Sequence, residues 1–360
     1  MKLQASYFKK TFTFGFKART SRGLMRDKTS WFIRVWDKEN PAIAGIGECG
    51  PLPGLSPEAG PDFEGIIENV VKRINDFDRI VEGEEAFYFL LREVLSGDFS
   101  SLKFALETAW LDLRNGGVKR IYHNGFMEGQ PIPINGLVWM GDLDFMMSQI
   151  NEKVALGFRC IKLKVGGLDF DRECDILRYI RQKYFREDIV IRLDANGAFK
   201  TDDVLYKLNQ LSQYNIHSIE QPLKPGLFET AELCRKSPIP LAFDEELIGI
   251  TKYEDKVRLL TTLKPQFIIL KPTLHGGLKE CSEWISIAEN LKIGWWITSA
   301  LESNVGLNAI CQFTANYPVT LPQGLGTGMI YENNLSAPLR VEKGTIRYDP
   351  AGVWYDSDAE

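Results

Sequence analysis

From Pro131 onward the chain repeats one local pattern, a short β-rich run followed by an amphipathic helical stretch. Successive runs begin about 25 to 30 residues apart, which is the length of one strand and one helix. The eight expected strands are Ile132–Val138, Cys160–Val165, Val190–Asp194, Ser218–Glu220, Leu241–Asp244, Phe267–Leu270, Gly294–Thr298 and Val319–Gln323. Eight such parallel strands close into a barrel with the helices outside. The α/β pattern therefore predicts a TIM-like (β/α)7β barrel over residues 126–330.

One feature favours a barrel over an open sheet, and another indicates where the barrel ends. An open doubly wound sheet is the other common arrangement of such units, but no Gly-x-Gly-x-x-Gly follows the first run. After residue 330 the chain contains no further strand-helix unit. We expect residues 331–360 to return to the N-terminal domain.

The first 125 residues have a different pattern and predict an α+β capping domain. Tyr7–Phe16 and Ser30–Trp36 alternate apolar with polar side chains, as half-buried antiparallel strands do. We expect a polar, basic loop between them at 18–26 and a loop rich in Gly and Pro at 45–57. Helical periodicity follows in three segments, Phe63–Phe77, Glu84–Leu95 and Leu102–Asn115. The order of elements is thus strands first and helices afterwards.

Composition and charge exclude several classes of function. The 43 basic and 48 acidic residues give a net charge of −5 with no block of like charge, which argues against nucleic-acid and membrane partners. The first residues lack the apolar region of a signal peptide, and no run of about 18 apolar residues occurs. The six cysteines are scattered and only three histidines are present, so we expect no zinc site. We expect a cytoplasmic protein that acts on a small molecule.

Ionisable residues end five consecutive strands of the predicted barrel, where Val, Ile and Leu are the rule. In the second strand, the period of two places Lys162 and Lys164 on the same, inward face. The next four strands end in Asp194, Glu220, Asp244 and Lys271. One such residue is often a helix cap or a member of an ion pair. Five in register at the carboxyl ends, where barrel active sites lie, predict a catalytic site.

Three of these strand ends carry carboxylates on neighbouring strands. Asp194, Glu220 and Asp244 are expected to converge, and their charges would repel one another without a cation between them. Oxygen ligands without Cys or His select Mg²⁺, with Mn²⁺ as a substitute. Glu245 and Glu246 are alternatives to Asp244, which directly ends the strand. The pattern predicts a magnesium site at this end of the barrel.

The strand-end motifs together resemble the enolase superfamily, in its muconate lactonizing enzyme subgroup. They are Lys-x-Lys (162–164), Arg-Leu-Asp-Ala-Asn (192–196), Ile-Glu-Gln-Pro (219–222), Phe-Asp-Glu (243–245) and Lys-Pro (271–272). The resemblance implies that the three carboxylates hold Mg²⁺ and that Lys164 and Lys271 are acid/base lysines. Strands two and six lie opposite each other in an eight-stranded barrel, so these lysines would flank the ligand. We expect Lys162 to lower the pKa of Lys164, and Asn196 to contact the substrate.

Loops near the last strands offer donors to an anionic substrate. Ser299, the N-terminus of a helix beginning near Ser303, and the backbone amides of Gly324 and Gly326 could bind a carboxylate. Arg22, in the basic loop at 18–26, is expected to close over the substrate. The alternative for each small residue is a tight turn. Together they favour a dicarboxylate substrate.

The substrate follows less directly from the residues. No carboxylate occurs between Glu302 and Glu332, which disfavours a substrate ammonium group. The stretch Trp295–Leu307 resembles subgroup members that eliminate water from a ring, so we expect Mg²⁺-dependent syn dehydration of 2-succinyl-6-hydroxy-2,4-cyclohexadiene-1-carboxylate to 2-succinylbenzoate, a step of menaquinone synthesis. Racemisation of an N-succinylamino acid, another reaction of the subgroup, and non-catalytic carboxylate binding are the alternatives. The sequence does not predict an oligomeric state.

Overall fold

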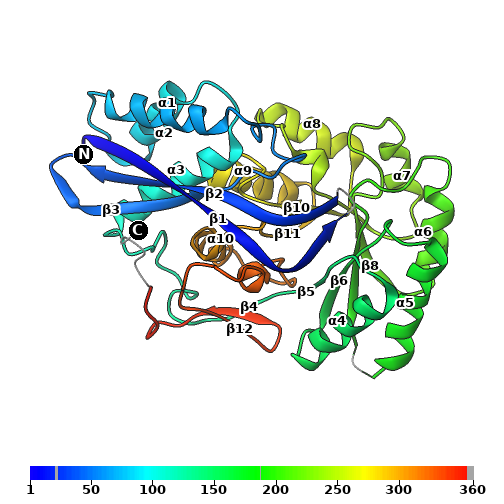
Figure 1. The fold of residues 1–360 in the computed structure, drawn as a ribbon. Helices are drawn as coiled ribbons and strands as arrows, with labels where there is room; N and C mark the ends of the chain where they lie inside the picture. The colour runs from blue at the N-terminus through cyan, green and yellow to red at the C-terminus, as the bar shows by residue number, and fades with distance from the viewer. Residues whose placement is uncertain (21–22, 187, 355–360) are drawn as a thin grey trace.

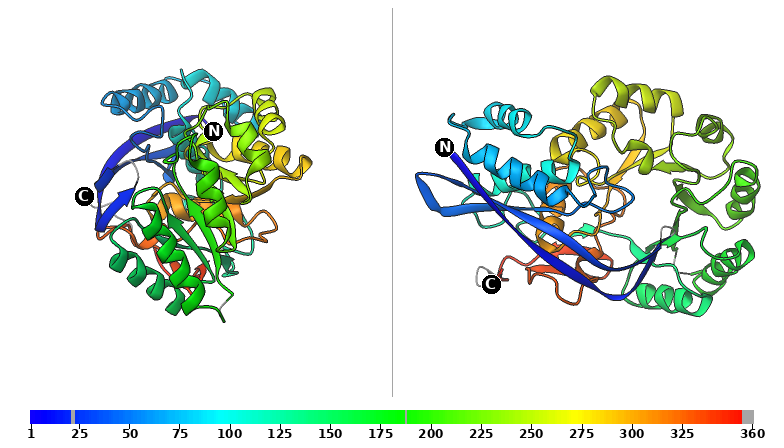
Figure 2. Two further views of the ribbon diagram at one scale, coloured as in Figure 1. Left: turned by 90° about the vertical axis from the view of Figure 1, so that its right-hand side faces the viewer. Right: turned by 45° about the horizontal axis from the view of Figure 1, so that its top comes forward.

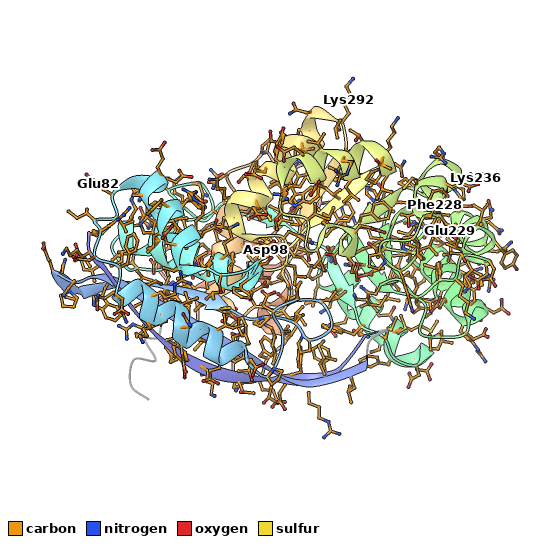
Figure 3. All side chains as sticks on the ribbon, turned by 90° about the horizontal axis from the view of Figure 1, so that it is seen from above. Glu82, Asp98, Phe228, Glu229, Lys236 and Lys292 are labelled. Atoms are coloured by element: carbon orange, nitrogen blue, oxygen red, sulfur yellow. The ribbon has the colours of Figure 1, made fainter. Side chains whose placement is uncertain are left out.

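The structure, a computed structural model, describes residues 1–20, 23–186 and 188–354. An N-terminal antiparallel sheet with three helices lies beside a barrel of parallel strands with helices outside (Figure 1). In Figure 3, Glu82 of the first part and Lys236 of the second lie toward opposite ends of the molecule. Within the described ranges, no helix is long and apolar enough to cross a membrane.

The N-terminal sheet consists of β1 (Leu3–Thr20), β2 (Gly23–Asp37) and β3 (Asn40–Cys49), all antiparallel. β1 and β2 form a long hairpin that reaches along the barrel (Figure 2). The prediction of a loop at 18–26 is wrong for the described residues of that segment, which belong to the two strands. The predicted loop at 45–57 is strand as far as Cys49, so its first five residues are also corrected.

Two glycines explain why β3 was missed. A Cβ atom at Gly45 would lie 1.9 Å from the carbonyl oxygen of Ala109, and one at Gly47 would lie 1.9 Å from that of Ala105. Both carbonyls belong to α3 (Ser100–Arg114), which packs directly on β3. Glycine is therefore required here by close approach of strand and helix, although in a sequence it indicates a turn.

Three helices cover one face of this sheet: α1 (Phe63–Asn75), α2 (Gly83–Val94) and α3. Their bounds confirm the three helices predicted from periodicity. The apolar faces of the helices and sheet form a core of their own, in which the rings of Phe87 and Trp110 stack 4.3 Å apart. This stack joins α2 to α3 within that core.

Seven parallel strands form one curved sheet in the order β5 to β11, and bridges between its two edges close it, which confirms the predicted barrel. The strands are β5 (Gly136–Val138), β6 (Cys160–Lys164), β7 (Val190–Asp194), β8 (Ile216–Glu220), β9 (Leu241–Phe243), β10 (Phe267–Leu270) and β11 (Gly294–Ile297). The helices outside are α4 (Leu143–Ala155), α5 (Phe170–Lys183), α6 (Val204–Ser212), α7 (Thr230–Lys236), α8 (Tyr253–Leu263), α9 (Gly277–Asn290) and α10 (Asn304–Thr314). Short 3₁₀ helices η1 (Glu245–Leu247) and η2 (Thr327–Met329) follow β9 and the last barrel residues.

The eighth strand is reduced to two bridging residues. Gln323 pairs with Ile134 and Gly324 pairs with Thr298, which joins the two edges of the sheet. The predicted strand Val319–Gln323 is wrong in its extent, because prolines at 318 and 322 remove backbone donors that a ladder needs. The barrel is still closed at this position.

The C-terminal segment contacts both parts of the molecule. Tyr331 bridges Phe14 of β1. The hairpin of β12 (Leu339–Glu342) and β13 (Thr345–Tyr348) instead pairs with β4 (Ile132–Pro133), the start of the first predicted barrel strand. That run is thus divided between two sheets, with β5 alone in the barrel.

A buried carboxylate from the N-terminal sheet fastens that sheet to the barrel. Glu48 is fully buried and accepts hydrogen bonds from the backbone N–H groups of Ser303 (2.8 Å) and Gly306 (2.9 Å) and from the Ser30 hydroxyl (2.8 Å). It therefore occupies the N-terminus of α10, where an anion is stabilised by free donors and the helix dipole. Glu107 of α3 does the same at the start of α9.

Glu48→Ala should destabilise the protein by about 2 to 4 kcal/mol, because it leaves buried N–H and O–H groups without their acceptor. Urea unfolding measures the loss. Glu39→Ala is the matched control, since Glu39 lies exposed in the turn between β2 and β3. Equal stability of the two variants would contradict a fastening role for Glu48.

Candidate active site

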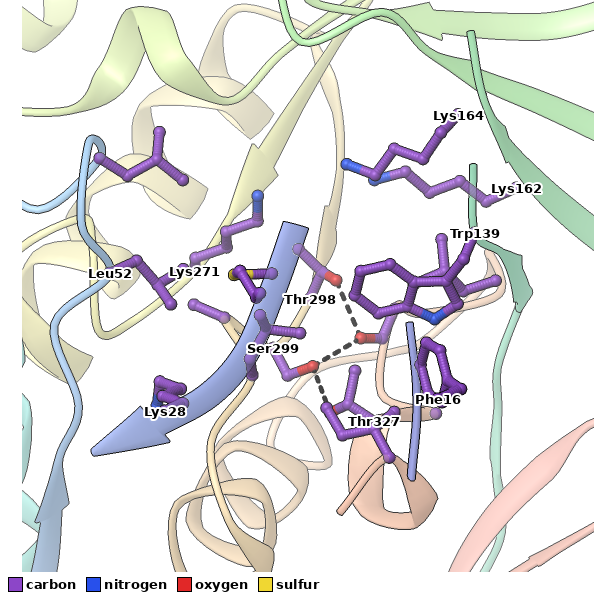
Figure 4. Close-up of a pocket in the computed structure, with 18 of the residues that line it drawn as sticks. Phe16, Lys28, Leu52, Trp139, Lys162, Lys164, Lys271, Thr298, Ser299 and Thr327 are labelled. Atoms are coloured by element: carbon purple, nitrogen blue, oxygen red, sulfur yellow. Dashed lines mark hydrogen bonds between the residues drawn. The ribbon is translucent and has the colours of Figure 1, made fainter. Parts of the chain in front are cut away.

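A cavity of about 950 Å³ lies between the N-terminal sheet and the carboxyl ends of the barrel strands. β6 contributes Lys162 and Lys164, and Lys271 follows β10 (Figure 4). The hairpin of β1 and β2 contributes apolar side chains such as Phe16 and Leu24. Pockets of this size bind small organic ligands. The three strand-end lysines predicted from the sequence thus face the same cavity.

The two lysines of β6 point into the cavity side by side, as their alternation predicted (Figure 4). Lys162 Nζ lies 2.9 Å from Asp194 Oδ2 and 2.5 Å from Glu220 Oε2. Lys164 Nζ lies 2.7 Å from Asp194 Oδ2 and donates to Asn196 Oδ1 at 2.7 Å. Burial opposes the charge of Lys162, but the two carboxylates outweigh it and raise its pKa. Lys162 is therefore held as an ammonium.

Lys271 follows β10 and faces the β6 lysines across the cavity (Figure 4). Its ammonium contacts the Asp244 carboxylate and lies 3.9 Å from Glu220 Oε1. Its backbone N–H donates to His275 Nδ1 at 2.9 Å, so the Nε2–H of that ring donates to the Asp244 carbonyl oxygen at 3.2 Å. Burial and the nearby Lys271 charge lower the pKa of His275 to about 3. A neutral histidine thus orients the turn that carries Lys271.

Glu220, Asp244 and Glu245 place carboxylate oxygens within 4.8 Å of one another. Asp194 is opposite Glu220 in the strand register. All four are buried, and Asp244 Oδ1 has no hydrogen-bond donor among the described residues. Sequence reasoning gave Glu245 only as an alternative to Asp244, whereas the structure brings the two together.

The electrostatics of this cluster suit a divalent cation among the carboxylates. Burial, and then the charge of Asp194, raise the pKa of Glu220 to about 8. Burial also opposes the charge of Asp194, but the ammonium groups of Lys162 and Lys164 prevail and lower its pKa. Carboxylates this close repel one another, and a cation bound between them would relieve that repulsion. The orphaned oxygen and the all-oxygen donor set fit a hard divalent ion.

Asn196 holds a position that its backbone makes possible. It has a φ of 44°, a left-handed conformation that Asn tolerates better than most residues. Its side chain accepts from Lys164 Nζ and donates to Glu245 Oε1 at 2.9 Å. It lines the cavity, so it remains a proposed substrate contact, and it also fixes the amine of Lys164.

The loop donors differ from the prediction. Ser299, Gly324 and Gly326 line the cavity, and the Ser299 hydroxyl shares a hydrogen bond with Thr327 at 2.7 Å (Figure 4). The Gly324 amide already donates to a carbonyl of β11 at 2.8 Å, and a Cβ atom there would lie 2.0 Å from Thr298 Oγ1. The predicted donor at Gly324 is therefore part of barrel closure. The helix N-terminus near Ser303 is likewise occupied by a carboxylate of β3.

Three further residues considered in the sequence are Arg22, Arg192 and Glu246. Arg22 lies outside the described residues. Arg192 stacks on Trp296 at 4.0 Å, and donates to the Pro322 carbonyl at 2.7 Å, inside the barrel. Glu246 accepts from the Gly226 amide at 3.1 Å, which gives it a structural role apart from the three-carboxylate group.

Comparisons with known proteins show which family this chain is similar to. Residues 146–353 match the family described as enolase C-terminal domain-like. An o-succinylbenzoate synthase of Desulfotalea psychrophila is 41% identical over 96% of this chain and 98% of its own length. The crystal structure of MenC from that organism has a TM-score of 0.81 at 39% identity, covering 96% of this chain and 99% of that one. The N-succinyl Arg/Lys racemase of Bacillus cereus shares the fold, with a TM-score of 0.83 at 19% identity over 97% of this chain and 93% of that one.

The chain belongs to the enolase superfamily. Within it, the chain falls in the muconate lactonizing enzyme subgroup and resembles the o-succinylbenzoate synthases, which confirms the resemblance seen in its motifs. Enzymes of this superfamily act on small molecules with a divalent metal ion, and the three buried carboxylates Glu220, Asp244 and Glu245 lie close enough together to hold one.

Proposed function

We propose that the protein is an o-succinylbenzoate synthase that catalyses the syn dehydration of 2-succinyl-6-hydroxy-2,4-cyclohexadiene-1-carboxylate to 2-succinylbenzoate in menaquinone synthesis. The observation that carries the proposal is one cavity with lysines on both faces and buried carboxylates beside them, in a chain 41% identical to an enzyme of that name. The activity is that of a carbon–oxygen lyase.

Asp194, Glu220 and Asp244 are the proposed ligands of Mg²⁺, with Mn²⁺ as a substitute. The bound ion supplies positive charge at the carboxylate oxygens of the substrate where negative charge develops. Glu245 accepts a hydrogen bond from Asn196 and thereby orients the side chain that contacts the amine of Lys164.

Lys164 is the proposed base. It removes the ring proton α to the carboxylate, and the electrons of that C–H bond form the new double bond of the ring. The same ammonium then returns the proton to the hydroxyl group that leaves from the same face, which releases water and an aromatic ring. Hydrogen bonds to Asp194 and Asn196 aim the amine of Lys164 for both transfers.

Lys271 is the proposed stabiliser on the other face. Burial opposes its charge, but Asp244 and Glu220 outweigh it and raise its pKa, which keeps it an ammonium. A cation above a flat, electron-rich ring contributes about 0.5 to 2 kcal/mol.

Racemisation of an N-succinylamino acid is the second candidate function, because both lysines face the cavity and that reaction needs a proton acceptor on one face and a proton donor on the other. The deciding experiment supplies the purified protein and Mg²⁺ with the cyclohexadiene substrate, and separately with N-succinylamino acids in D₂O. Ultraviolet absorbance follows aromatisation, and NMR follows deuteration of the α-carbon. Aromatisation alone supports a dedicated synthase, and activity with neither substrate would leave carboxylate binding as the function.

Lys271→Arg should retain a measurable part of the dehydration rate and lose any racemisation, because guanidinium keeps the positive charge but does not act as a base. Rates with both substrates are measured side by side. Complete loss of dehydration with normal Mg²⁺ affinity would make Lys271 a proton-transfer group and overturn the one-base mechanism.

A further inference from the structure

Lys28 is a buried lysine of the cavity to which the proposed mechanism gives no role. It lies on β2, is 6% exposed, and lines the cavity. Figure 4 places it on the far side from Lys162 and Lys164. The cavity therefore has a second cationic region, contributed by the N-terminal sheet.

The ammonium of Lys28 is poorly satisfied. Its ammonium donates to Ser30 Oγ at 3.3 Å, and among the described residues no carboxylate oxygen lies within ion-pair distance, 4.0 Å, of Lys28 Nζ. An ammonium has three donors, and a buried charge without partners is costly. A Cβ atom at Gly50 would lie 2.3 Å from Lys28 Nζ, so this glycine leaves space for the amine.

The neighbouring acids are engaged elsewhere. Glu48 accepts from the N-terminus of α10 and from Ser30, as described above. Glu302 accepts from the Thr273 hydroxyl at 2.6 Å and from the Ala300 amide at 2.7 Å. Both influence Lys28 only at longer range, which leaves its donors available to a ligand.

We propose that Lys28 binds the second carboxylate of a dicarboxylate substrate, the one remote from the reacting carbon. The inference rests on the proposed function, whose substrate carries one carboxylate on the ring and one at the end of a succinyl chain. The ring carboxylate belongs at the metal site, and the succinyl carboxylate then extends toward the N-terminal sheet. A charge-assisted hydrogen bond in this enclosed region selects substrates with a terminal anion.

The test compares two ligands in two proteins by calorimetry with Mg²⁺ present. The ligands are 2-succinylbenzoate and 2-butyrylbenzoate, in which a methyl group replaces the terminal carboxylate. Lys28→Met should weaken binding of 2-succinylbenzoate at least about tenfold and change binding of 2-butyrylbenzoate less than about twofold. Lys10→Met is the control, because Lys10 pairs with Ser30 across the sheet and does not line the cavity.

Equal loss for both ligands would assign Lys28 a structural role, and no loss for either would remove it from the site; each result overturns the inference. Should Lys28→Met not fold, Lys28→Gln, which retains a donor for Ser30, is measured in its place. If the unaltered protein neither aromatises the cyclohexadiene substrate nor binds 2-succinylbenzoate, the proposed function itself fails and the inference fails with it. If the unaltered protein turns over the cyclohexadiene substrate normally but the Lys28 variant does not discriminate between 2-succinylbenzoate and 2-butyrylbenzoate, only the inference about Lys28 is contradicted.

Discussion

Lys164→Ala should lower kcat/KM for dehydration by about four orders of magnitude, because it removes the group that both takes the α-proton and returns it to the leaving hydroxyl. The side chain reaches the cavity from the end of β6, and its amine is fixed by Asp194 and Asn196. Lys271, on the opposite face, cannot replace it in a syn elimination. Exchange of the substrate α-proton in D₂O should disappear together with dehydration.

Lys153→Ala provides the control for this prediction. Lys153 also lines the cavity, but it lies on α4 and its ammonium is 3.4 Å from Glu152. Its removal should change the rate by less than about tenfold. A Lys164→Ala protein that keeps a tenth of the activity, with correct folding and normal Mg²⁺ affinity, would falsify the assignment of Lys164 as base.

The strand-end residues could be placed from the sequence because two simple rules act together. A period of two decides which side chains of a strand face inward, and a closed parallel barrel brings all strand ends to one face. Lys162 and Asp194 needed nothing more, and the structure joins them in an ion pair. His275 lies in the turn after β10, where neither rule applies, although its position four residues after a strand-end lysine is a usable signal.

Lys28 could have been found from the sequence. The alternation recognised in Ser30–Trp36 continues two residues earlier, which places Lys28 on the same buried face as Ser30. A charged lysine on the face of a strand that is expected to be buried departs from the pattern of the strand, and such departures often mark functional residues. The predicted loop ended at residue 26 and the predicted strand began at Ser30, so Lys28 was assigned to neither.

Predictions failed where a partner distant in sequence decides the role of a residue. The start of α10 was expected to bind an anionic substrate, and it does bind a carboxylate, but that of Glu48, 255 residues away from Ser303. The loop predicted around Gly45 and Gly47 was wrong for the same reason. These glycines are required because α3, which is distant in sequence, packs directly against them. Local patterns identify donors and small residues, but the tertiary structure decides what they meet.

Asp244→Asn should abolish the stabilisation that Mg²⁺ gives the protein and lower kcat/KM by about three orders of magnitude. A ligand that binds only the folded state stabilises it by about 2.7 kcal/mol at a hundredfold excess over its dissociation constant. The thermal midpoint of the unaltered protein should therefore rise with Mg²⁺ and fall back with EDTA. Asp244→Asn should unfold at the same temperature in both conditions, because Asp244 Oδ1 is buried, has no donor among the described residues, and is one of the oxygens proposed to bind the ion.

Glu246→Gln is the control for Asp244→Asn, because it changes a nearby acid that is not proposed as a metal ligand. Glu246 is two residues from Asp244 and buried, but it accepts from the amides of Gly226 and Gln221 rather than joining the carboxylate group. The same chemical change there should preserve the response of the thermal midpoint to Mg²⁺, even if the midpoint itself falls. If Glu246→Gln loses the response and Asp244→Asn keeps it, the ion is held by a different set of carboxylates from the one at the strand ends.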